Sequence, residues 1–215
     1  MSERNRTIAA GGSHEIIVRR SRFICSLQRT TSEEEGKAFI AAVRKQFWDA
    51  SHNCSAWVIG TRGELQRSND DGEPAGTAGQ PMLSALNHHG LTDTTAVVTR
   101  YFGGTLLGAG GLVRAYGQAV TEAIGAVGIV ERRPMQIMHI TCPHTTAGKL
   151  DFALRGSPFH VAEIDYADQV TFELHIQPEQ VDPLQQWLAE TTNGQLLAAP
   201  VGIDYVEVPV SVGSP

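Results

Sequence analysis

The most informative stretch of the chain is TTAVVTRYFGGTLLGAGGLVRAYGQAVTEAI, residues 94–124. Residues 94–101 form a β-branched run that is typical of a buried strand. After a glycine-rich loop, apolar residues recur at helical spacing and predict a helix over residues 110–125; they are Leu112, Val113, Tyr116, Val120 and Ile124. The stretch therefore predicts a strand, a glycine loop and a helix, a combination that is typical of domains built from both kinds of element.

The glycine loop is a candidate phosphate site. A helix start exposes unsatisfied N–H groups and a positive dipole end, and Arg100 and Arg114 flank the loop and could each bind a phosphate through two hydrogen bonds. The alternative is that the glycines only permit positive φ and close packing. The P-loop and GxGxxG fingerprints are both absent, because Ala109 and Val113 occupy positions that these motifs reserve for other residues. The candidate residues are Arg100, Gly103, Gly104, Gly108, Gly110, Gly111 and Arg114.

A second candidate is the acidic run Asp70–Asp71–Gly72–Glu73, which lies in the turn-forming segment SNDDGEPAGTAG, residues 68–79. Its three carboxylates, those of Asp70, Asp71 and Glu73, could hold Mg²⁺ or Ca²⁺. They could equally form ion pairs with Arg100 or Arg114 across the fold. Turn chemistry explains the Asp-Gly pair without any ligand, so metal binding and bracing both stay open.

Two smaller groups are also candidates. His52 and Cys54 stand two residues apart on a predicted strand and so share one face, where they could bind a metal or act as a Cys/His dyad. Small core residues beside a structural histidine are the alternative. The cluster Arg19–Arg20–Arg22 could contact a phosphate backbone or could be a solvated edge strand.

The first 134 residues otherwise read as one α/β domain. We expect a flexible leader over residues 1–13 and two strands with a tight break at Ser21. A capping box at Ser32 predicts the start of a helix. Pro81 opens a further helix. The other expected elements are strands over 14–20 and 22–28, a helix over 33–47, a hairpin of 51–60 with 64–68, and a closing strand over 127–131.

A second domain is expected over residues 135–210, after a boundary at Arg132–Arg133–Pro134. Its predicted order is strand, helix, strand, strand, helix, strand. That βαββαβ order is the ferredoxin-like pattern. The fold class we expect is α+β with two domains. The predicted elements are 135–142, 145–155, 160–166, 170–177, 178–190 and 201–208.

The composition is 41% hydrophobic and 19% charged, which is typical of a globular protein. Cys25, Cys54 and Cys142 lack CxxC spacing, so we expect reduced and mostly buried thiols instead of a disulfide framework or a zinc knuckle. No apolar run approaches the roughly 20 residues that cross a bilayer. The first residues also lack the apolar segment of a secretory signal. We therefore expect a cytoplasmic protein without membrane contact.

The charge is distributed unevenly. Residues 1–134 carry 15 Lys and Arg against 13 Asp and Glu, whereas residues 135–215 carry 2 against 10. Any contact with nucleic acid is therefore expected in the first domain, because the acidic second domain would repel phosphate. The second domain is better suited to a protein partner.

Four segments together resemble the YigZ/Impact (UPF0029-type) family of uncharacterised, translation-associated proteins. They are SRFIC (21–25), ASHNCSAWVIG (50–60), SNDDGEPAGTAGQPML (68–83) and VVTRYFGGTLLGAGGLVRAYGQA (97–119). The resemblance covers most of residues 14–134. The domain after Pro134 is similar to the family's ferredoxin-like domain through its element order.

The resemblance implies that the first domain has the fold of the second domain of ribosomal protein S-five. It also implies that the second domain is like a late domain of elongation factor G. Eukaryotic relatives regulate translation by interfering, through a protein partner, with activation of an initiation-factor kinase. They carry an amino-terminal RWD module, which we do not expect in the short segment before His14, so we do not expect that specific partner for this chain.

Three functional hypotheses follow. The first is a non-catalytic regulator of the translation machinery, which binds RNA, the ribosome or a translation factor through the first domain and a protein through the acidic second domain. This hypothesis requires no cofactor. The alternative is a Mg²⁺-dependent enzyme that acts on a nucleotide or a phosphorylated small molecule at the glycine loop, with Asp70 and Asp71 as metal ligands or base. In the third, residues 70–79 and 103–114 only brace one another within an interaction module.

Overall fold

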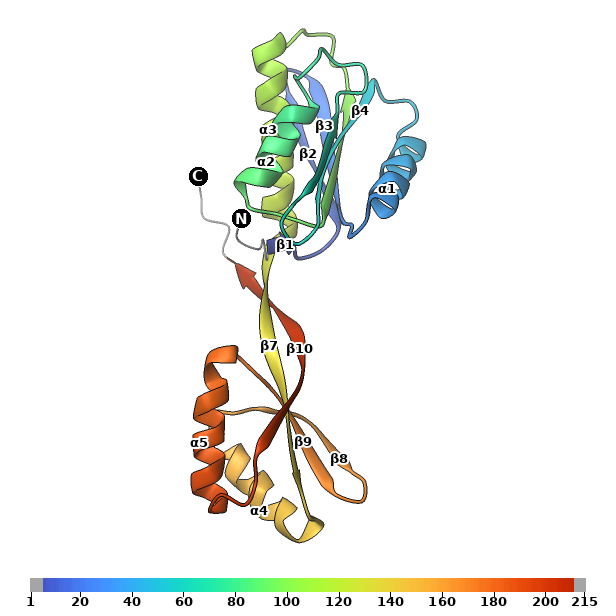
Figure 1. The fold of residues 1–215 in the computed structure, drawn as a ribbon. Coiled ribbons are helices and arrows are strands. Elements are labelled where there is room, and N and C mark those ends of the chain that lie inside the picture. The colour runs from blue at the N-terminus through green and yellow to red at the C-terminus, as the bar shows by residue number, and fades with distance from the viewer. Residues whose placement is uncertain (1–5, 211–215) are drawn as a thin grey trace. The chain divides into compact units, whose positions relative to one another are not determined.

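The computed structural model describes residues 6–210 (Figure 1). The described part of the chain divides into two compact units, residues 6–132 with 207–210 and residues 133–206. Each unit combines a sheet with helices, so the expected α+β class with two domains is confirmed. Within the described part of the chain, no helix is long and apolar enough to cross a membrane.

The first unit is built on a five-stranded sheet of order β2-β3-β6-β4-β5. Neighbouring strands are antiparallel throughout. The central strand β6 spans the residues predicted for it, Thr94 to Tyr101. The strands are β2 (Gly12–Val18), β3 (Ser21–Arg29), β4 (His52–Ile59), β5 (Leu65–Asn69) and β6 (Thr94–Tyr101).

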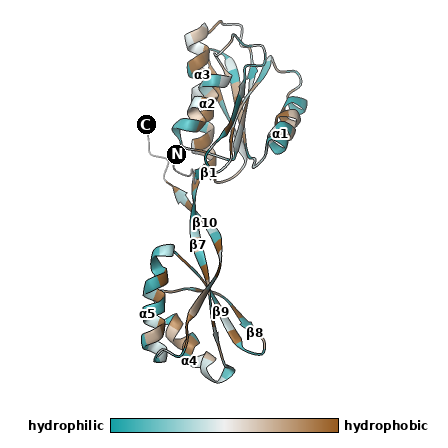
Figure 2. Cartoon of the chain, viewed as in Figure 1, coloured by the Kyte–Doolittle hydropathy of each residue, from teal (hydrophilic) through white to brown (hydrophobic). Residues whose placement is uncertain are grey.

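Helices cover both faces of this sheet (Figure 1). Alternation along β4 explains how: Cys54, Ala56 and Val58 enter the core shared with α2 and α3, whereas Trp57 faces Gly36 of α1. Figure 2 shows hydrophobic residues along α3 and a largely hydrophilic α1. The helices are α1 (Glu33–Gln46), α2 (Gly79–His88) and α3 (Ala109–Val127).

The start of α1 follows from its sequence. The Oγ of Ser32 accepts a hydrogen bond from the Glu35 N–H at 3.2 Å. The Glu35 carboxylate turns back to the N–H of Thr31 at 2.7 Å. The predicted cap at Ser32 is therefore confirmed, although the return bond goes one residue earlier than a capping box requires.

The turn between the first two long strands differs from the prediction. The chain reverses at Arg19 and Arg20, where φ is 46° and 70°, whereas we expected the break at Ser21. Two successive left-handed residues match the twist of a two-residue hairpin. Ser21 is instead the first residue of β3 and pairs with Val18.

The flexible leader expected over residues 1–13 is wrong for part of that range. Strand β1 (Arg6–Ile8) pairs with the beginning of β7 (Ile129–Cys142). Ile8 is fully buried in the first core, and this burial holds the segment in place. Residues 1–5 lie outside the described part of the chain.

The separate strands expected over 127–131 and 135–142 are instead one strand, because β7 runs through Arg132–Arg133–Pro134 without interruption. β1 pairs with residues 129–131 and β9 with residues 136–142. Pro134 thus lies between the residues of β7 that pair with β1 and those that pair with β9, and β10 pairs with β7 as well. The compact units nevertheless divide close to the expected place.

The second unit has the predicted βαββαβ order. Its strands lie in the order β10-β7-β9-β8, and its helices contribute Leu150, Leu154, Leu184 and Leu188 to a core of its own. The elements that follow β7 are α4 (His144–Arg155), β8 (Val161–Tyr166), β9 (Val170–Ile176), a short 3-10 helix (Pro178–Gln180), α5 (Val181–Thr192) and β10 (Ala198–Val210).

Candidate functional site

The glycine loop lies against the turn between β2 and β3. The N–H of Gly103 donates to the Ser21 hydroxyl at 3.2 Å. A Cβ at position 103 would overlap the carbonyl group of Arg20. Only glycine permits this close approach of two backbones, so the sequence of the loop positions the Arg19–Arg20 turn.

A hollow of about 280 Å³ separates this turn from the start of α3. Arg19 and Arg114 line it from two segments that lie far apart in the sequence. Arg19, Arg20 and Arg114 are all exposed, and none of the three forms an ion pair among the described residues. We call these three side chains the arginine rim. The hollow is completed by Val18, Leu107, Gly111, Ala115 and Gln118.

The start of α3 leaves its backbone N–H groups open. The N-cap is Gly108 at φ 73°, no side chain caps the helix, and its first turn contains no acidic residue. The helix begins at Ala109, one residue before the predicted start, so Gly110 and Gly111 lie in its first turn. Unsatisfied N–H groups and the positive end of the helix dipole are favourable for an anion there.

Arg100 does not join the arginine rim. Its side chain is 7% exposed, and its Nη1 lies 2.6 Å from Oε1 of Glu73. The guanidinium packs over the rings of Phe23 and Phe102. This placement differs from the expectation that Arg100 flanks the loop as a surface ligand, because the charge of Arg100 is neutralised inside the unit.

Glu73 is the centre of a buried polar network. Besides Arg100, its Oε1 accepts a hydrogen bond from the Tyr116 hydroxyl at 2.8 Å. The Cys54 thiol lies 3.4 Å from that hydroxyl and donates to the carbonyl oxygen of Asp70 at 3.0 Å. The network ties the acidic run to β4, β6 and α3. Sequence reasoning missed Tyr116, because its position on the apolar face of α3 gives no sign of its hydroxyl's partner.

The carboxylates of Asp70 and Asp71 are occupied by backbone and arginine donors. Asp70 accepts from the N–H groups of Gly76, Ala78 and Gly79 at 2.8–3.0 Å. Burial opposes ionisation of Asp70, but these three hydrogen bonds together lower its pKa. Asp71 receives hydrogen bonds at 2.7 Å from Arg44 and from the N–H of Asn53. Arg44, on α1, carries no sequence signal for this role.

These contacts hold the acidic run against the neighbouring elements of the first unit, and we call the contacts of Asp70, Asp71 and Glu73 together the brace. In residues 6–210 no three His, Cys, Asp or Glu side chains are grouped so that they could hold a metal ion. Magnesium binding at the acidic run therefore stays a prediction to which the geometry adds no support.

His52 and Cys54 both contact the acidic run, as their shared strand face implies. His52 Nδ1 lies 2.8 Å from the carbonyl oxygen of Asp71. Burial raises the pKa of the Cys54 thiol to about 12, so that thiol stays protonated at neutral pH and is a poor nucleophile. All three cysteines are free and buried, as expected.

The surface around the glycine loop is apolar as well as basic. Leu106 is 82% exposed and Phe102 is 49% exposed. Val113, on the first turns of α3, is also exposed. The sequence shows apolar residues in and beside the glycine loop, and the structure leaves them exposed, as on a surface that contacts other molecules.

The fold and the site define a two-domain α+β protein whose first unit carries an arginine rim and a glycine loop. The chain belongs to the IMPACT family. The family model for the Impact N-terminal domain matches residues 19–124, and that for a domain of unknown function, DUF1949, matches residues 140–195. The resemblance found in the sequence is therefore confirmed.

Individual relatives agree over most of the chain. IMPACT family member YvyE of Bacillus subtilis is 47% identical over 95% of this chain and 94% of its own. IMPACT family member YigZ of Escherichia coli is 37% identical over 83% and 89%. A crystal structure described as that of a hypothetical protein covers 94% of this chain and 99% of its own, with 34% identity and a TM-score of 0.59.

Proposed function

We propose that this protein is a non-catalytic regulator of the translation machinery that binds RNA, on the ribosome or free, through the arginine rim of its first unit. The observation that carries the proposal is the hollow beside the uncapped start of α3 that Arg19 and Arg114 line together. Arg20 follows Arg19 in the same turn, and none of the three arginines has an ion-pair partner in residues 6–210. Membership of the IMPACT family supports it, since eukaryotic relatives regulate translation. A cytoplasmic location belongs to the same proposal.

Phosphate is the ligand chemistry that this rim favours. Guanidinium groups bind phosphate oxygens in pairs of hydrogen bonds, and open N–H groups at a helix start add to the attraction. Phe102, in the glycine loop, offers a half-exposed ring on which an unpaired base could stack. The expected likeness of the first unit to a ribosomal protein domain points the same way.

The proposal implies that the first unit binds RNA weakly, because the chain as a whole carries a charge of −6. Attraction is confined to the arginine rim, where two or three phosphates are neutralised. Single-stranded RNA binding then falls with salt at a logarithmic slope of roughly −0.7 per phosphate. The acidic second unit takes no part in RNA contact and faces a protein.

We do not extend the proposal to a Mg²⁺-dependent enzyme. That alternative requires Asp70 or Asp71 as a metal ligand or a base. Both carboxylates are instead held by hydrogen bonds to neighbouring donors, and releasing them would leave those donors unpaired.

The test is binding of fluorescein-labelled ribosomal RNA fragments and of purified ribosomal subunits, measured across a salt series. We expect Arg114→Ala and the pair Arg19→Ala with Arg20→Ala each to weaken binding about fivefold or more, and to flatten the salt slope. Lys45→Ala is the matched control, because Lys45 is an exposed cation at the end of α1. Binding that does not change with salt, or that both arginine-rim variants retain at the wild-type level, contradicts the proposal.

A further inference from the structure

Strand β8 leaves one side of the second unit's sheet unpaired. In the described residues β9 is the only strand that pairs with β8. The backbone N–H and C=O groups along the other side of β8 are therefore available to an added strand. The ladder to β9 is regular over Glu163–Tyr166 and is interrupted by a bulge between Val161 and Glu163.

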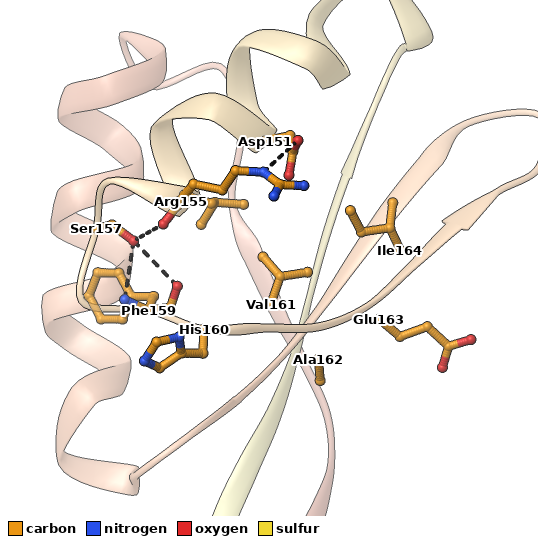
Figure 3. A pocket seen from close by; sticks show the side chains of 10 residues that line it. Asp151, Arg155, Ser157, Phe159, His160, Val161, Ala162, Glu163 and Ile164 are labelled. Atoms are coloured by element: carbon orange, nitrogen blue, oxygen red, sulfur yellow. Dashed lines mark hydrogen bonds and ion pairs between the residues drawn. The ribbon is translucent and has the colours of Figure 1, made fainter.

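A groove of about 420 Å³ lies between this strand and the end of α4. Figure 3 shows Val161 and Ile164 pointing toward α4, with Ala162 and Glu163 pointing away. Val161 and Ile164 pack against the buried residues of the second core. Arg155 and Asp151 form an ion pair at 3.0 Å on the helix side of the groove. Tyr166, two residues beyond Ile164, is 68% exposed and continues the same apolar row.

The opposite face of β8 is acidic. Glu163 and Asp165 alternate with the apolar row, and both are exposed. Glu163 pairs in register with Glu173 of β9, whose carboxylate is hydrogen-bonded to His139 and His175 at 2.9 Å and 2.8 Å, so Glu163 and Asp165 are the carboxylates that this face offers to a partner. A segment added beside β8 would thus meet apolar side chains on the helix side and carboxylates on the other.

We propose that β8 accepts an extended segment of a partner protein in which apolar and basic residues alternate, as an added strand along the groove. Main-chain hydrogen bonds supply affinity in such an addition, and alternate side chains supply specificity. Apolar residues of the segment lie over Val161, Ile164 and Tyr166. Its basic residues pair across the strands with Glu163 and Asp165.

The acidic face also selects the partner. Two copies of this chain would bring Glu163 and Asp165 against like charges, which is unfavourable across adjacent strands. A basic segment has the reverse effect, so the same carboxylates reject self-association and favour the partner. The inference rests on the proposed role of the second unit in protein contact and not on RNA binding by the first.

The test uses the full chain and labelled eight-residue peptides. A peptide of alternating lysine and valine is expected to bind at least tenfold more tightly than its glutamate and valine counterpart at low salt. Two further peptides carry N-methyl groups on one or the other alternate set of amides. Only one of these sets faces β8 in an added strand, so one peptide loses binding tenfold or more and the other keeps it.

Charge-reversed variants test the surface itself. Glu163→Lys with Asp165→Lys is expected to reverse the preference between the two peptides. The control, Glu179→Lys with Asp182→Lys, changes the net charge equally at exposed positions outside β8 and leaves the preference in place. Amide NMR shifts on addition of the lysine peptide are expected at 163–166, and dispersed spectra of each variant show that it is folded.

Several results would overturn the proposal. They are no binding of the lysine peptide, equal effects of the two N-methylated sets, an unchanged preference in the β8 variant, or shifts that avoid residues 163–166. Arg114→Ala is expected to bind the peptide as the wild type does. Failure of RNA binding and failure of peptide binding are therefore separate outcomes.

Discussion

The acidic run at residues 70–73 and the glycine loop at residues 102–108 look alike in the sequence, since both are polar or glycine-rich loops that precede a helix. In the structure they differ in what their polar groups contact. The carboxylates of Asp70, Asp71 and Glu73 all accept hydrogen bonds from within the first unit. The arginine rim beside the glycine loop forms no ion pair in residues 6–210. Whether a polar group already has a partner separates a brace from a binding surface.

The largest effect should come from the centre of the brace. We expect Glu73→Ala to lower the free energy of unfolding by about 3–5 kcal/mol, because it leaves Arg100 charged, buried and unpaired. Urea denaturation in a Trp187→Phe background measures this, since Trp48 and Trp57 then report the first unit alone. Glu34→Ala, at an exposed position of α1, is the control. A loss below 1 kcal/mol for Glu73→Ala would show that the network is not a brace.

The next effect concerns the start of α2. Asp70→Ala removes the acceptor of three backbone N–H groups, and we expect a loss of about 2–3 kcal/mol in the free energy of unfolding. The same urea experiment measures it. RNA binding by the folded variant should equal that of the wild type. A loss of RNA binding without a loss of stability would instead show that Asp70 contacts the ligand.

Asp70 should also leave a signature in the pH dependence of stability. Its pKa is lowered in the folded unit from an ordinary value of 3.8, so its carboxylate stabilises the fold above that value. The contribution is lost as the pH falls through the lowered pKa. We expect the difference in unfolding free energy between wild type and Asp70→Asn to shrink below about pH 4. A difference that stays constant from pH 6 to pH 2 would contradict this assignment.

The substitution Gly103→Ala is expected to affect both the stability of the first unit and its RNA binding. The added methyl overlaps the Arg20 carbonyl group, so we expect a loss of about 1–3 kcal/mol in stability and a displaced Arg19–Arg20 turn. RNA affinity should fall together with stability. Gly104→Ala is the comparison, because a Cβ there meets no atom within 4 Å and its cost is that of positive φ alone.

The smallest effect on stability is expected at the arginine rim. Arg114→Ala should change the free energy of unfolding by less than about 0.5 kcal/mol, although it weakens RNA binding about fivefold. Thermal denaturation and the RNA assay on one protein sample measure both quantities. A large loss of stability would place Arg114 within the brace and would weaken the contrast between the two regions.

Much of the fold could be predicted because it depends on neighbouring residues. The helix at α1 follows from Ser32 and from apolar residues at helical spacing, and β6 follows from its β-branched run. The break at Ser21 was wrong because a turn of two left-handed arginines has no strong sequence signal, unlike Asn-Gly. The two strands expected on either side of Arg132–Arg133–Pro134 are one strand, β7, because whether a proline interrupts a strand depends on where its neighbours pair.

The candidate site residues could be named from the sequence, but which of them pair with one another could not. Sequence alone named candidates within residues 52–114 and, separately, the cluster Arg19–Arg20–Arg22, and it treated Arg100 and Arg114 as equivalent ligands. The tertiary structure separated them: Arg100 is buried against Glu73 and Tyr116, whereas Arg114 shares a hollow with Arg19. Propensity and periodicity act over a few residues and are written in the chain, but burial and pairing depend on residues that only folding brings together.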